Sequence, residues 1–124
     1  MDIIRKDYPE LGRPGGPFCH AVRAGNMLFI SGATARDTEA ANGTTAQQAE
    51  AVLKKLAHIL EAEGGTLTNV VKVTVFVTAI GDRDSIAAVR RRYFQGAYPA
   101  STLVEVSALA APNLKVEIEA VAVL

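Results

Sequence analysis

Residues 69–78 are mostly apolar, with Lys72 and Thr74 as polar positions between valines, and the segment is dense in β-branched and aromatic side chains and free of glycine and proline. Such a composition predicts a strand. Because side chains alternate along a strand, one face is wholly apolar, consisting of Val71, Val73, Val75 and Val77. The other face is mixed, consisting of Val70, Lys72, Thr74 and Phe76. We therefore predict a strand at the centre of a sheet covered on both sides, by helices on one side and by another copy of the chain on the other.

Helical spacing of apolar residues predicts a first helix after residue 44. Thr44 and Thr45 are suitable N-caps, and Gln47 and Gln48 are placed for a capping-box contact. The apolar stripe consists of Ala49, Val52, Leu53, Leu56, Ile59 and Leu60. Glycines 64 and 65 end the run, and His58, which lies off the stripe, is interpreted as solvated.

A second, shorter helix is predicted after Asp82, which is expected to be its N-cap, and Gly96 ends it. Its apolar stripe consists of Ile86, Val89, Tyr93 and Phe94. The run of three arginines at positions 90–92 resembles a nucleic-acid-binding patch, but consecutive helical residues point in different directions. A solvated face is therefore favoured for the three arginines.

Short apolar runs complete the predicted sheet. Residues 19–24 and 27–31, separated by a Gly-Asn pair, predict a β-hairpin, and residues 101–106 and 115–123 predict two further strands. Residues 1–17 contain three prolines and three glycines and are expected to form an irregular arm. The order hairpin, helix, strand, helix, strand, strand predicts an α+β fold with both helices on one face of a mixed sheet.

The last predicted strand carries two carboxylates on one face. Its apolar face, assigned to the helices, consists of Val116, Ile118, Ala120 and Ala122. Glu117 and Glu119 share the opposite face with Val121 and Val123. If this face packs against another subunit, the valines are favourably buried. Burying a glutamate there costs free energy unless it is paired or has a catalytic function. Two neighbouring carboxylates also favour a shifted pKa for one of them. The alternative, favoured by the spacing alone, is an edge-strand charge that discourages aggregation.

Composition narrows the class of protein. Lysines and arginines balance acidic residues at 13 each, and 49% of residues are apolar, which opposes disorder and gives no attraction to nucleic acid or anionic membranes. No apolar run is long enough for a membrane span, and the N-terminus does not resemble a secretory signal. The single cysteine, Cys19, fits a reducing cytoplasm. The two histidines, His20 and His58, are far apart in sequence, so no metal site is expected.

Several motifs, in order along residues 16–123, resemble the RidA family, also called YjgF/YER057c/UK114. They are Gly16-Pro17-Phe18, Gly25-Asn26-Met27, Ile30-Ser31-Gly32, residues 71–77, Pro99-Ala100, Val104-Glu105-Val106 and Val116-Glu117-Ile118-Glu119-Ala120. The resemblance implies a single RidA-like domain over residues 1–124 with a chorismate-mutase-like (bacillus type) fold. It further implies a homotrimer with a central barrel-like core and sites between subunits. With the composition, we expect a cytoplasmic protein that needs no cofactor and has no nucleic-acid or membrane partner.

The resemblance also implies an activity, the hydrolysis of reactive enamines and imines such as 2-aminoacrylate to 2-keto acids and ammonia. Carried over by position, Glu117 is the catalytic residue that positions the attacking water, and the backbone of Ser31-Gly32 donates hydrogen bonds. Phe18 occupies the place of a tyrosine that walls the pocket. Leu103 contributes a backbone carbonyl that helps to hold the water, and Ser101 stands where the family's arginine clamps the substrate carboxylate.

Ser101 is the important departure, because a hydroxyl offers one donor where a guanidinium offers two parallel ones. Three interpretations stay open. In the first, the substrate is an imine or enamine, or a related carbonyl ligand, whose carboxylate is absent or bound elsewhere. In the second, another cation binds the carboxylate, with His20, Arg36 and Lys115 as candidates. In the third, the protein is a non-catalytic small-molecule-binding or chaperone-like trimer. Retention of the glutamate favours the first interpretation. The neutral charge gives no support to the ribonuclease activity also attributed to the family.

Overall fold

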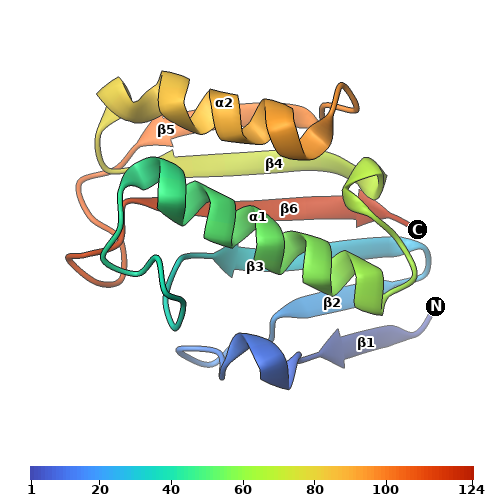
Figure 1. Ribbon diagram of the computed structural model, residues 1–124. Helices are drawn as coiled ribbons and strands as arrows, with labels where there is room; N and C mark the ends of the chain where they lie inside the picture. The colour runs from blue at the N-terminus through green and yellow to red at the C-terminus, as the bar shows by residue number, and fades with distance from the viewer.

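The computed structural model describes all 124 residues, which form one six-stranded sheet covered on one face by two helices (Figure 1). The strands are β1 (Ile3–Lys6), β2 (Ala21–Ala24), β3 (Met27–Ala33), β4 (Val70–Val77), β5 (Ala100–Glu105) and β6 (Val116–Val123). Their order in the sheet is β1-β2-β3-β6-β4-β5, and every neighbouring pair is antiparallel except β4 and β5, which are parallel. The predicted α+β architecture with a mixed sheet is confirmed.

Helices α1 (Thr45–Ala62) and α2 (Arg83–Phe94) lie side by side on the same face of the sheet (Figure 1). The capping box at the start of α1 is confirmed for Gln47: its backbone N–H donates to Thr44 Oγ1 at 3.2 Å, and its Oε1 accepts from the Thr44 N–H at 2.9 Å. The alternative with Gln48 is wrong, because that side chain is completely buried. Three short 3₁₀ helices, η1 (Pro9–Leu11), η2 (Leu67–Asn69) and η3 (Ile80–Asp82), complete the elements.

Asp82 occupies the predicted N-cap position of α2, but its side chain does not cap the helix. Asp82 ends η3, so one helical turn runs directly into α2, and the Asp82 side chain makes no capping hydrogen bond. Its Oδ2 instead accepts a hydrogen bond from Thr45 Oγ1 at 2.7 Å, which joins the starts of the two helices. At the other end, the left-handed residue that terminates α2 is Gln95, one residue before Gly96.

The hydrophobic core lies between the helices and the sheet, and it includes the predicted apolar stripes of both helices. On β6 the predicted face is confirmed, since Val116, Ile118, Ala120 and Ala122 are all buried. The carboxylate-bearing residues of β6 therefore point to the open face of the sheet, which neither helix covers.

On β4 the predicted face is correct for Val73, Val75 and Val77, which are buried, but wrong for Val71, which is 46% exposed. The pairing of β4 with β6 shifts register between Val70 and Lys72. An extra residue in a strand reverses the side-chain alternation, so Val70 is buried under the helices and Val71 is turned away from the core. The strand is interior, as predicted, but only β5 separates it from the sheet edge.

The N-terminal arm is more ordered than predicted. Residues 3–6 form β1, which pairs antiparallel with β2, and η1 follows it. The side chain of Tyr8, between these two elements, is buried in the core. The phenol hydroxyl of Tyr8 donates to Glu63 Oε2 at 3.0 Å, so contacts distant in sequence hold the arm in place.

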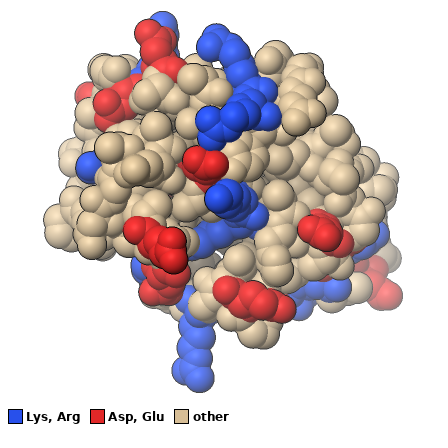
Figure 2. All heavy atoms as spheres, in the orientation of Figure 1, with Lys and Arg blue, Asp and Glu red and all other residues tan.

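The two faces of the sheet differ in character. Over the helix-covered face, basic and acidic side chains are interspersed without an extended area of one sign (Figure 2). The open face instead exposes large apolar side chains, namely Met27, Phe29, Val71, Val104 and Val123. Neither helix combines the length and the apolar character that crossing a membrane requires.

Candidate functional site

The carboxylate of Glu117 lies across the backbone of Gly32, where β6 runs beside β3. A Cβ atom built on Gly32 would overlap Glu117 Oε2, so any larger residue would displace the carboxylate from this position. The register between the two strands shifts between Ile30 and Ala33, and this irregularity includes Ser31 and Gly32. Two of the predicted site residues are thus brought together by a local break in the strand pairing.

Burial raises the pKa of Glu117 above the ordinary value of 4.5, and the nearby charge of Glu119 raises it further. The Glu117 carboxylate receives no hydrogen bond and forms no ion pair within the chain, so nothing stabilises its charged form. A half-buried carboxylate with a raised pKa and unoccupied oxygen atoms is suited to accept a proton from a water molecule.

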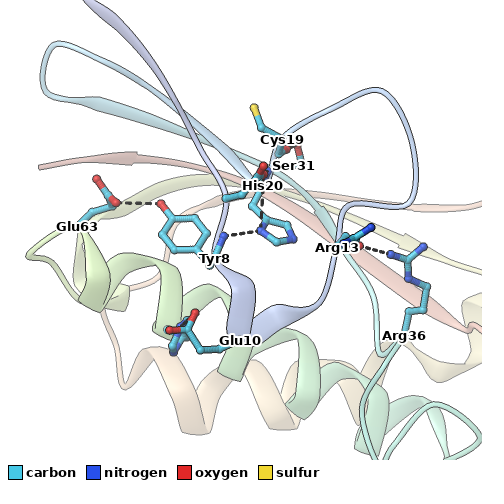
Figure 3. Close-up of polar contacts among 10 residues, drawn as sticks. Tyr8, Glu10, Arg13, Cys19, His20, Ser31, Arg36 and Glu63 are labelled. Carbon is cyan, nitrogen blue, oxygen red and sulfur yellow. Dashed lines mark hydrogen bonds and ion pairs between the residues drawn. The ribbon is translucent and has the colours of Figure 1, made fainter.

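Ser31 has a structural role in addition to its place beside Gly32. Its hydroxyl donates to the Cys19 carbonyl oxygen at 2.7 Å, and its backbone N–H donates to the His20 carbonyl oxygen at 2.9 Å. Figure 3 shows Ser31 against the Cys19 and His20 segment. The expected backbone donor at Ser31 is therefore occupied within the chain.

The structure places Ser101 and Leu103 away from Glu117. Both are on β5, paired with Val73 and Val75 of β4, whose side chains face the helices. Neighbouring residues of adjacent strands point to the same side, so the side chains of Ser101 and Leu103 lie on the helix side of the sheet and Glu117 on the open side. Phe18 is 53% exposed in the single chain.

Comparison with known proteins identifies the family. The sequence model described as Endoribonuclease L-PSP matches residues 11–124. The chain belongs to the RidA (YjgF/YER057c/UK114) family. It is 34% identical to the human 2-iminobutanoate/2-iminopropanoate deaminase over 126 residues, covering 98% of this chain and 91% of that protein.

Solved structures of similar proteins agree with the fold. PA3499 from Pseudomonas aeruginosa superposes with a TM-score of 0.91 at 40% identity, covering 99% of this chain and 93% of that one. Rv2704 from Mycobacterium tuberculosis, described as a member of the YjgF/YER057c/UK114 family, has a TM-score of 0.79 at 33% identity, covering 86% of each chain. The predicted mixed sheet with two helices is thus the fold of RidA-family proteins.

The sequence patterns did not identify Arg90 as a contact of Ser101, the residue at the position where the RidA family has its arginine. Arg90 Nη2 donates to Ser101 Oγ at 2.7 Å, so a guanidinium from α2 lies against the residue that replaces the family's arginine. The interpretation of all three arginines as a solvated face is therefore wrong for Arg90, which is half-buried, and holds for Arg91 and Arg92, which are exposed. A signal was present, because Arg90 follows the buried Ile86 by one helical turn.

The three cations considered as substitutes for the arginine all have other partners. His20 Nδ1 accepts a hydrogen bond from the Tyr8 backbone N–H at 2.9 Å, and Arg36 Nη2 donates to the Arg13 carbonyl oxygen at 2.6 Å (Figure 3). Lys115 Nζ donates to the Gly43 carbonyl oxygen at 2.9 Å. No three side chains of histidine, cysteine, aspartate or glutamate gather as a metal-ligand set.

Proposed function

We propose that this RidA-family protein hydrolyses reactive imines and enamines to carbonyl products and ammonia, with Glu117 as the group that handles the proton of the attacking water. The observation that supports this most directly is the Glu117 carboxylate, which lies over Gly32 without a donor and with a raised pKa. The similarity to a human protein named as a 2-iminobutanoate/2-iminopropanoate deaminase supports the same class of reaction.

In the proposed reaction, an enamine first takes up a proton on carbon and becomes an iminium ion, the protonated form of an imine. Water then attacks the imine carbon, forming a C–O bond, while Glu117 accepts the proton that the water loses. Transfer of that proton to the nitrogen of the tetrahedral intermediate allows the C–N bond to break. Glu117 is thereby returned to its carboxylate form, ammonia leaves with the electrons of the C–N bond, and the remaining hydroxyl releases its proton to solvent as the carbonyl forms. This proton balances the one taken up at the start, so the sum is enamine or imine plus water to carbonyl compound plus ammonia.

We further propose that the active form is a homotrimer with its sites between subunits. The open face of the sheet exposes Phe29, Val71, Val104 and Val123, which one chain leaves uncovered. A set of large apolar side chains on one sheet face is characteristic of an interface. A second copy that covers this face supplies the apolar partner for these residues and encloses Glu117.

The proposed reaction is tested by Glu117→Gln, which keeps the volume and removes the titrating group. Ammonia release from imines generated in situ by an amino-acid oxidase is expected to fall by at least roughly a hundredfold. Glu119→Gln, on the same face of β6, is the matched control and is expected to retain most of the activity. Equal rates for wild type and Glu117→Gln would contradict the assignment of Glu117.

A second candidate is a non-catalytic small-molecule-binding or chaperone-like trimer of the same family. Ser101 in place of the expected arginine favours it, because a serine alone is a weak carboxylate ligand. If the wild type releases no ammonia above background from several amino-acid and amine imines, this second candidate replaces the deaminase.

A further inference from the structure

The guanidinium of Arg90 is half-buried and has no carboxylate partner in the chain. Its only side-chain hydrogen bond goes to Ser101 Oγ, and burial lowers its pKa. The nearby Arg92, by contrast, is exposed and pairs with Glu50 at 3.1 Å. A partly desolvated positive charge without a counter-charge is unfavourable, and a bound anion relieves that cost.

The arrangement of donors around Arg90 suits a carboxylate. A guanidinium has five N–H donors in a planar fork, and Ser101 takes one of them. Because the Ser101 oxygen accepts from Arg90, its own O–H is available to donate to the same ligand. Ser101 itself is exposed on the edge strand β5, so a ligand can reach the pair from solvent.

We propose that Arg90 and Ser101 together form a carboxylate-binding subsite, so that the substrates are imines of 2-keto acids rather than imines without a carboxylate. The guanidinium then comes from helix α2 instead of strand β5. This inference rests on the proposed function for the identity of the reaction, but the binding of the carboxylate is tested without turnover.

The positions of the Arg90–Ser101 pair and of Glu117 also indicate which chains contribute residues to one site. Ser101 lies on the helix side of β5, whereas Glu117 lies on the open side of β6, and β4 separates the two strands. Arg90 and Glu117 of one chain are separated by two strand spacings, roughly 10 Å, and lie on opposite sides of the sheet. They therefore cannot both contact one small substrate. Since β5 is an edge strand, the catalytic Glu117 for each Arg90–Ser101 subsite comes from a neighbouring copy of the chain.

The subsite is tested by calorimetric titration with 2-oxobutanoate, a stable keto acid, without any reaction. Arg90→Gln is expected to weaken binding by about tenfold or more, because charge-assisted bonds are lost. Arg91→Gln removes the same charge one residue away, at an exposed position, and is expected to bind like the wild type. Glu117→Gln is expected to bind as well but not to turn over, so failed catalysis and a failed subsite give different results.

Two further variants guard against misfolding. Arg90→Lys keeps the charge without the planar fork, and Ser101→Ala keeps Arg90 without the hydroxyl; both are expected to give intermediate affinities at an unchanged Tm. With carboxylate-bearing imines, Arg90→Gln is expected to raise KM more than it lowers kcat. A wild type that does not bind 2-oxobutanoate, or equal losses in Arg90→Gln and Arg91→Gln, would overturn the subsite.

The inter-subunit composition is tested by co-expressing Arg90→Gln and Glu117→Gln chains. If each site takes Arg90 and Glu117 from different chains, random assembly is expected to restore about a quarter of the wild-type sites, although each variant alone is impaired. If both residues served the same site from one chain, no intact site would form, and the absence of recovery would overturn this composition.

Discussion

At the scale of single residues, two carboxylates show how environment sets charge. The side chain of Glu63 is only 2% exposed, and burial alone would raise its pKa. Hydrogen bonds from Tyr8 and Lys6, with Arg23 also in reach, outweigh burial and lower the Glu63 pKa. Glu117 has no such donors, so burial acts unopposed and its pKa rises. The ionised form of the first carboxylate therefore stabilises the fold, and the ionised form of the second destabilises it.

We predict opposite effects on stability when these two carboxylates are neutralised. The folded protein binds a proton at Glu117 more tightly than the unfolded chain, so ionisation destabilises the fold as pH rises above 4.5. Glu117→Gln is therefore expected to raise Tm at neutral pH and to have little effect below pH 4. Glu63→Gln is expected to lower Tm at neutral pH, and its deficit is expected to shrink as pH falls below 4.5, through the lowered pKa of Glu63. Melting curves across this pH range test both signs, and a Glu117→Gln variant less stable than wild type at neutral pH would contradict the account.

At the scale of elements, one buried side chain of α1 fixes the loops around the start of β6. Gln48 Nε2 donates to the Asn113 carbonyl oxygen at 2.9 Å and to the carbonyl oxygens of Ala41 and Gly43 at 3.3 Å each. Its Oε1 accepts from the Lys115 backbone N–H at 2.8 Å, two residues before Glu117. The Gln48 amide thus bonds both the loop that precedes α1 and the loop that precedes β6. The direction in which β6 presents its carboxylates therefore depends on α1.

Replacing Gln48 is expected to destabilise the protein strongly. Gln48→Met preserves the length of the side chain but leaves the backbone groups of both loops without partners, at a cost of about 3 kcal/mol or more. Gln47→Met, which removes only the exposed capping-box contact, is expected to cost about 1 kcal/mol. Urea unfolding of the two variants measures the difference, and equal losses would show that the buried amide contributes no more than a helix cap.

At the scale of the whole molecule, the two helices cover one face of the sheet and leave the other face uncovered. The helices bury the apolar residues of one side, while Phe29, Val71 and Val123 stay exposed on the other. The same face carries polar side chains, among them Lys72, Thr74, Glu117 and Glu119. Assembly and catalysis are therefore expected to depend on the same surface.

We predict that Phe29→Asp abolishes assembly, because it places a charge in the centre of the open face. Ile80→Asp introduces the same charge at another exposed apolar residue, in η3 and outside the sheet, and is expected to leave the oligomer intact. Sedimentation equilibrium distinguishes the outcomes: a trimer for wild type and Ile80→Asp, and a monomer for Phe29→Asp. A wild type that sediments as a folded monomer would contradict the proposed assembly.

Local patterns in the sequence by themselves determined much of this protein. The alternation on β6, the apolar stripe of α1 and the order of elements depend on neighbours within a few residues, so sequence spacing predicts them. The family motifs likewise pointed to Glu117 and Gly32. The tertiary structure decided what depends on register and on contacts distant in sequence. A one-residue shift in β4 turned Val71 outward, a break in β3 placed Gly32 under Glu117, and the packing of α2 beside β5 brought Arg90 to Ser101. Such contacts follow from how elements meet, which no local periodicity encodes.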